Sequence, residues 1–174
     1  MSDRDPVVTD MRPGNRADLP ALAEVFVAAW RGGYRGVVPD DVIDAMDATL
    51  AETELAPSVE AADRTTLVAF DADGDIVGFT IFGPDRDRDG GYLASLYVSP
   101  TAGGRGIGWS LLTAAVEGMP GVDITLWVFA GNVRARRLYE RAGFRPDGTE
   151  LTDPRWRALQ IRYRRSAGGV SAQC

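Results

Sequence analysis

Apolar and polar positions follow two different periods along this 174-residue chain. Between residues 19 and 30, apolar side chains recur at steps of three and four, which predicts a helix with one buried face. Asp18 is typical of the residue that caps such a helix, Pro20 of its first turn and Gly32-Gly33 of its end. The apolar face consists of Leu19, Leu22, Val25, Phe26, Ala29 and Trp30.

Shorter segments are rich in β-branched and aromatic residues and predict strands. Thr65–Phe70 and Ile76–Phe82 flank an Asp-Gly turn, which favours a hairpin. The segment 53–62 is helix or loop, interrupted near Pro57. Further strands are predicted at 7–12, 92–98, 122–129 and 156–163 and from 144, and further helices at 39–46, 110–119 and 132–142.

The order of these elements predicts the fold class. Antiparallel strands come first and a strand–helix–strand–helix series follows, which favours an α/β fold (α+β mixed), with a mixed sheet and helices on both faces. No internal repeat, low-complexity block or linker divides the sequence. We therefore expect a single domain over residues 1–166 and a flexible tail over 167–174.

The composition narrows the possible functions. Asp and Glu number 25 against 19 Lys and Arg, and a formal charge of −6 disfavours nucleic acid or an anionic membrane as partner. With no long apolar run and no signal peptide, a cytoplasmic location is expected. The absence of histidine excludes Ser-His-Asp and Cys-His catalysis and disfavours a zinc site, so no metal is expected. The one cysteine, Cys174, is a poor candidate nucleophile.

A glycine-rich segment at residues 103–108 lies between a predicted strand and a predicted helix. It reads Gly-Gly-Arg-Gly-Ile-Gly. Glycines allow the main chain to approach a ligand closely, and the free N–H groups of a first helical turn attract a phosphate. The alternative is a tight loop with glycine helix caps and no ligand.

A second segment follows at residues 126–144. Asn132 precedes Tyr139 by seven residues, about two helical turns, so both side chains can face one groove. With the glycine loop, this segment resembles the GCN5-related N-acetyltransferase (GNAT) family. In that family a loop of pattern Gln/Arg-x-x-Gly-x-Gly/Ala follows a strand, and an Asn precedes Ala-x-x-Leu-Tyr and Gly-Phe. Here Gly106 and Gly108 match the small positions of the loop, whereas Gly103 replaces its Gln or Arg.

The resemblance implies a mostly antiparallel sheet of six to seven strands and transfer of an acetyl group from acetyl-CoA to an amine. It implies that Tyr139 protonates the departing thiolate, although a tyrosine on such a helix is also often a core residue. Trp30 and Tyr34 would line the pocket of a small-molecule or peptide amine, with core packing at least as good an account of Trp30. A homodimer is possible. The residues implied to bind the cofactor are Leu96, Tyr97, Val98, Gly104, Arg105, Gly106, Ile107, Gly108, Trp109 and Asn132.

Physical roles for these residues can be argued directly. Attack of an amine on a thioester creates an oxyanion, which a main-chain N–H of the strand 92–98 could stabilise if a bulge or splay leaves it unpaired. No general base is identified, because the positions near which some family members carry a Glu hold Trp127 and Tyr92.

Two other functions remain open from the sequence. One is a CoA-binding sensor of the same fold with little activity, which Gly103 and the missing base favour. The other is a nucleotide-binding domain that uses the loop as a phosphate cradle. Against the latter, the motif Gly-x-x-x-x-Gly-Lys-Ser/Thr is absent and the dinucleotide fingerprint matches poorly.

Overall fold

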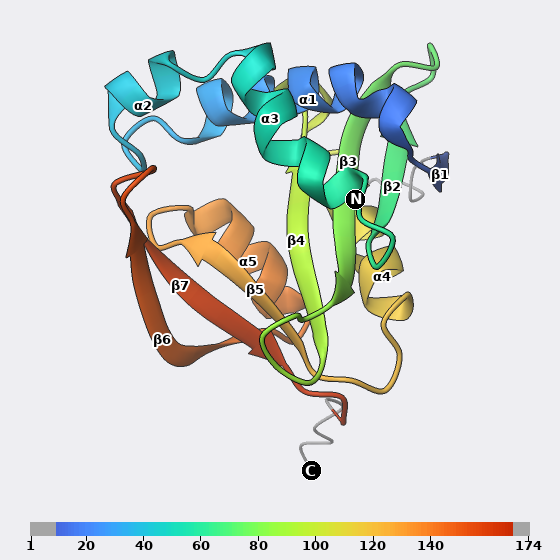
Figure 1. Ribbon diagram of the computed structural model, residues 1–174, viewed down its shortest axis with the longest axis vertical. Coiled ribbons are helices and arrows are strands. Elements are labelled where there is room, and N and C mark those ends of the chain that lie inside the picture. The colour runs from blue at the N-terminus through green and yellow to red at the C-terminus, as the bar shows by residue number, and fades with distance from the viewer. Residues whose placement is uncertain (1–9, 169–174) are drawn as a thin grey trace, which may run out of the picture.

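The computed structural model describes residues 10–168, in which seven strands form one sheet in the order β1-β2-β3-β4-β5-β7-β6 (Figure 1). Only the contact between β4 and β5 is parallel, so the predicted mixed, mostly antiparallel sheet is confirmed. The strands are β1 (Met11–Pro13), β2 (Thr65–Phe70), β3 (Ile76–Pro84), β4 (Gly91–Val98), β5 (Ile124–Phe129), β6 (Arg145–Asp153) and β7 (Ala158–Arg165). The helices are η1 (Arg16–Asp18), α1 (Leu19–Gly33), α2 (Asp40–Asp44), α3 (Ala48–Val59), η2 (Pro100–Ala102), α4 (Ile107–Glu117) and α5 (Val133–Arg141).

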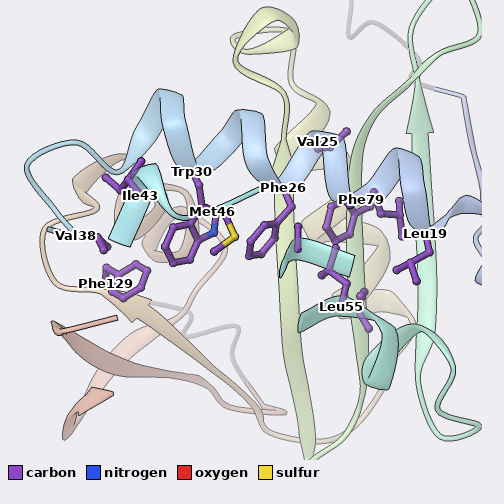
Figure 2. Packing of buried hydrophobic residues seen from close by; sticks show 14 of the residues in the cluster. Leu19, Val25, Phe26, Trp30, Val38, Ile43, Met46, Leu55, Phe79 and Phe129 are labelled. Carbon is purple, nitrogen blue, oxygen red and sulfur yellow. The ribbon is translucent and has the colours of Figure 1, made fainter. Parts of the chain in front are cut away.

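Helices cover both faces of the sheet, as predicted. The first three α-helices pack on one face, where Phe26 and Trp30 of α1 meet Phe79 of β3 in one apolar cluster (Figure 2). Helices α4 and α5 pack on the other face, against a cluster that includes Leu126 and Val128 of β5. Alternate side chains of a strand point to opposite faces, so β4 and β5 contribute to both clusters.

Helix α1 follows its predicted apolar face, and its Trp30 is only 2% exposed. Asp18 is the N-cap residue of α1, as predicted, although its side chain makes no capping hydrogen bond to that helix. Its carboxylate instead accepts from the main-chain N–H of Asn15 at 3.0 Å and from the guanidinium of Arg12 at 2.7 and 2.8 Å. The Asp18 side chain therefore stabilises the start of the short helix η1, and α1 begins without a side-chain cap.

Helix α3 corrects the doubtful segment near Pro57. The helix is capped by Asp47, whose side chain accepts from Leu50 N at 2.8 Å, and it continues through Pro57 to Val59. Proline removes one helical hydrogen bond, and only two residues of the helix follow it, so little of the ladder is lost. Strand β6 is also longer than the short strand predicted from residue 144. Residues 7–9 of the predicted first strand and 169–174 of the predicted tail lie outside the described residues.

The feature that positions the site is the separation of β4 from β5. The two strands are paired only at Gly91 with Ile124 and at Tyr92 with Thr125, and then diverge. On its other side β4 pairs with β3, but the register shifts so that Ala94 is an extra residue, a β-bulge. The main-chain groups of β4 that point away from β3 therefore have no strand partner beyond Tyr92.

Candidate active site

The diverging ends of β4 and β5 enclose a cavity of about 390 Å³. Its walls come from α1, α3, β4, β5, the start of α5 and the turn between β6 and β7, segments far apart in the sequence. Of the residues predicted to act on ligands, it is lined by Trp30, Tyr34, Leu96, Tyr97, Asn132 and Tyr139. The predicted site residues on both sides of the gap are thus brought together.

Three tyrosines, Tyr34, Tyr97 and Tyr139, line this cavity. Burial raises the pKa of Tyr139, and the neighbouring Tyr97 raises it further. Burial likewise raises the pKa of Tyr34 and of Tyr97. The Tyr139 hydroxyl makes no hydrogen bond to any residue between 10 and 168. Tyr139 is therefore a protonated phenol at neutral pH with its proton uncommitted.

Trp30 and Asn132 add polar groups to the same cavity. The Trp30 indole N–H is buried and has no partner within hydrogen-bond geometry. It nevertheless lies close enough to the Tyr97 hydroxyl to offset part of the rise that burial causes in the pKa of Tyr97. Asn132 caps α5, since its side-chain oxygen accepts from Ala135 N at 3.1 Å. Trp30 is at once a core residue and a cavity residue, which joins the two accounts that the sequence left open.

The glycine-rich segment forms a turn in front of helix α4. Gly104 has φ +78° and Gly106 has φ +81°, which are left-handed values that side chains rarely adopt. Gly106 is the N-cap of α4, and the first helical bond runs from Ser110 N to its carbonyl at 3.0 Å. Within the described part of the chain, the main-chain N–H groups of residues 104–109 donate no hydrogen bond. We call this segment the amide loop.

Arginine side chains of α5 lie beside the amide loop. A Cβ atom at Gly103 would lie 3.1 Å from Nη2 of Arg134, so the guanidinium of α5 occupies the space beside this glycine. On the other flank, the guanidinium of Arg141 lies 4.3 Å from the ring centroid of Trp109. The side chain of Trp109 is thus packed against Arg141 of α5.

Val98 differs from the other predicted residues of β4. It does not line the cavity and packs in the cluster formed with α4. Its methyl groups lie 3.7 Å from where a Cβ atom at Gly108 would stand, so it supports the amide loop from below. The side chain of Val98 therefore lies outside the cavity, and its role in binding the cofactor stays a prediction.

Sequence reasoning missed a charged group of three residues at the cavity wall, Glu54, Asp153 and Arg155. Nη1 of Arg155 donates to Oε2 of Glu54 at 3.0 Å, and the same guanidinium binds Asp153 through Nε and Nη2. Glu54 and Arg155 are 101 residues apart. No local pattern could have paired them.

The described residues contain no group of three or more His, Cys, Asp or Glu side chains arranged to hold a metal ion. None of their helices is long and apolar enough to cross a membrane.

The amide loop follows the C-terminal end of β4, and the cavity lies along the same strand. A free set of main-chain N–H groups at a helix start binds an anion such as a diphosphate. The opened strand and the Tyr139 phenol offer, beside it, hydrogen-bond donors to developing negative charge. This combination suits transfer of a group from a phosphate-bearing carrier.

Comparison with known proteins shows the family to which this chain belongs. A model of the acetyltransferase (GNAT) family matches residues 22–144, which include the amide loop, Asn132 and Tyr139. The chain belongs to this family. An uncharacterised N-acetyltransferase of Bacillus subtilis, YuaI, is 27% identical to this GNAT protein over 110 residues, 62% of each chain. A second, Mb2688 of Mycobacterium bovis, is 33% identical over 120 residues, 65% of this chain and 73% of the relative.

The GNAT fold is also found in solved structures. The PaiA N-acetyltransferase of Thermoplasma acidophilum, solved in complex with coenzyme A, superposes with a TM-score of 0.70 at 22% sequence identity. The superposition covers 92% of this chain and 99% of the other. The chain thus shares its fold with a protein that binds coenzyme A.

Proposed function

We propose that this GNAT protein transfers an acetyl group from acetyl-CoA directly to the amine of an acceptor bound in the cavity. The observation that carries the proposal is the amide loop, whose N–H groups at 104–109 are uncommitted, at the end of the strand that opens the cavity. Strand β4 runs from one to the other, so a molecule held by its diphosphate at the loop can extend along β4.

The residues present fit acetyl-CoA. Gly104 and Gly106 have no atom within 4 Å of where a Cβ would stand, so the main chain is open to a diphosphate on that side. Arg134 supplies beside Gly103 the positive charge that the side chain at position 103 lacks. When bound, acetyl-CoA supplies the acetyl group as an activated thioester.

The reaction places two demands on the chain. The carbonyl oxygen becomes negatively charged as the amine attacks, and an unpaired N–H of β4 between the bulge at Ala94 and Tyr97 can stabilise that charge. The sulfur then leaves as a thiolate, and the Tyr139 hydroxyl can donate its proton to it. The attacking amine gives up one proton to solvent, and the tyrosine phenolate takes a proton back from solvent. We propose direct transfer rather than a covalent acyl-enzyme, because the chain has no histidine to activate a nucleophile and its one cysteine is Cys174.

The test is to measure binding and turnover separately on the wild-type protein. Acetyl-CoA binding is followed by calorimetry, and CoA release by a thiol reagent in the presence of a panel of primary amines, with Cys174 subtracted as one equivalent. We expect binding together with amine-dependent release. Binding without release on every amine would show a sensor, and no binding would remove the role of the amide loop.

A further inference from the structure

The charged side chains of the cavity wall do not balance one another. Its charged lining residues, among those that the structure describes, are Glu54, Asp153 and Arg155, with a formal sum of −1. The three side chains also differ in how many of their polar atoms already have a hydrogen-bond partner. All three nitrogen atoms of the Arg155 guanidinium donate to carboxylates, whereas Oε1 of Glu54 has no hydrogen-bond partner among residues 10–168.

This difference decides which kind of acceptor the wall favours. Arg155 holds Asp153 through two nitrogens, so neither group is free to bind a substrate of the opposite charge. Glu54 is held through one oxygen only, and 27% of its side chain is exposed. A carboxylate fixed on one side and open on the other is suited to accept a hydrogen bond from an ammonium group.

Aromatic rings line the same cavity as this carboxylate. The ring of Trp30 lies 4.8 Å from that of Trp156 and 4.9 Å from that of Tyr34, and Tyr34 lies 5.2 Å from Phe129. All four rings line the cavity. The faces of aromatic rings attract a cation and accept an apolar body.

We propose that Glu54 binds the ammonium group of the acceptor and that the acceptors are primary amines with an aromatic or apolar body and no neighbouring carboxylate. The proposal rests on the transfer function proposed above and names its substrate class. An amino acid would bring its own carboxylate beside Oε1 of Glu54 with no free cation to meet it, because Arg155 is engaged. Amines and the corresponding amino acids should therefore differ.

The experiment uses two matched pairs, tyramine with tyrosine and phenethylamine with phenylalanine. Binding to the full-length protein is measured by calorimetry with and without saturating CoA. We expect the amine of each pair to bind at least about tenfold more tightly than the amino acid, since two like charges in a partly buried site repel. Glu54→Gln should weaken tyramine binding about tenfold, with CoA affinity unchanged.

The control is Glu52→Gln, on the same helix and outside the cavity, which should leave both affinities unchanged. Equal tyramine binding by wild type and Glu54→Gln overturns the proposal, as does equal binding of tyramine and tyrosine or no binding of either amine. Acetyl transfer is measured on the same samples. Amine binding that depends on Glu54 without any transfer would sustain the site and refute the transfer function instead.

Discussion

The two ends of the β4–β5 pair are built differently. At the closed end the strands are hydrogen-bonded, Gly91 N donates to Asp123 O at 2.8 Å, and Thr125 donates to the Asp85 carboxylate at 3.1 Å. At the open end the strands part, and uncommitted hydroxyl, indole and amide groups face a cavity. The closed end satisfies its polar groups and the open end leaves them free. Stability should therefore depend on the first and chemistry on the second.

The largest effect should come from Gly90→Ala at the closed end. Gly90 has φ +129°, and a Cβ atom there would lie 2.5 Å from the carbonyl oxygen of Asp123. We expect a loss of about 3 kcal/mol and a fall in melting temperature of about 6–12 °C. Gly74→Ala, with φ +88° and no atom within 4 Å, is the control and should cost about 1–2 kcal/mol. Equal losses would show that the contact with Asp123 contributes nothing.

At the open end, Tyr139→Phe should show the opposite pattern. Because the hydroxyl has no partner in the described chain, we expect the melting temperature to stay the same or rise slightly. Turnover should fall about 10²-fold if the phenol donates a proton. Since burial raises the pKa of Tyr139 above its ordinary value of about 10, wild-type turnover should show no loss from this group up to pH 10. Unchanged turnover in the variant would remove its role as the acid.

A smaller effect is expected from Gly106→Ala in the amide loop. Gly106 (φ +81°) and Gly148 (φ +88°) have similar backbone conformations and no atom within 4 Å of an added Cβ, so an alanine meets similar strain at both. Both variants should lose about 1–2 kcal/mol of stability. Only Gly106→Ala should weaken acetyl-CoA binding, about tenfold, in a calorimetric titration. Equal affinities in the two variants would contradict the loop's role.

The smallest effect should be seen in Asp123→Asn, at the surface of the closed end. The Arg164 guanidinium and the Ala167 N–H hold the pKa of Asp123 below its ordinary value of about 4. A lowered pKa means that the carboxylate stabilises the fold above pH 4 and loses this contribution as the pH falls through the lowered value. The variant should melt less than about 2 °C lower at pH 7, and the difference should vanish near pH 2. A constant difference across this range would exclude the charge as its cause.

Local features of the molecule were predictable from the sequence. The period of apolar residues placed α1, the Asp-Gly turn placed the β2–β3 hairpin, and the glycines at 103–108 placed the amide loop, because each depends on neighbours in the chain. The segment from Asn132 to Tyr139 brought its two side chains to one groove for the same reason. For residues 53–62 the sequence left helix and loop open, because proline is a strong break signal except near the end of a helix. The start of α3 at Ala48 and its continuation through Pro57 were therefore not predicted.

The contacts between distant segments could not be predicted. The splay between β4 and β5 depends on where pairing stops, and the residues themselves carry no sign of it. The approach of Arg134 to Gly103 and of Arg155 to Glu54 depends on how helices and turns pack after the sheet has formed. In the proposals above, these contacts set the preferred acceptor and the charge beside the loop, and no local sequence pattern records them.

The amide loop and the cavity wall also differ in how they respond to mutation. The loop presents backbone N–H groups, which every amino acid except proline provides. The diphosphate binding proposed for the loop should therefore persist through most substitutions that keep the glycines at 104 and 106. The wall around Glu54 consists of side chains, and a single codon change there alters its charge or shape. Under the proposed function, a lineage can therefore acquire new acceptors by changing the wall while it retains the same acetyl donor.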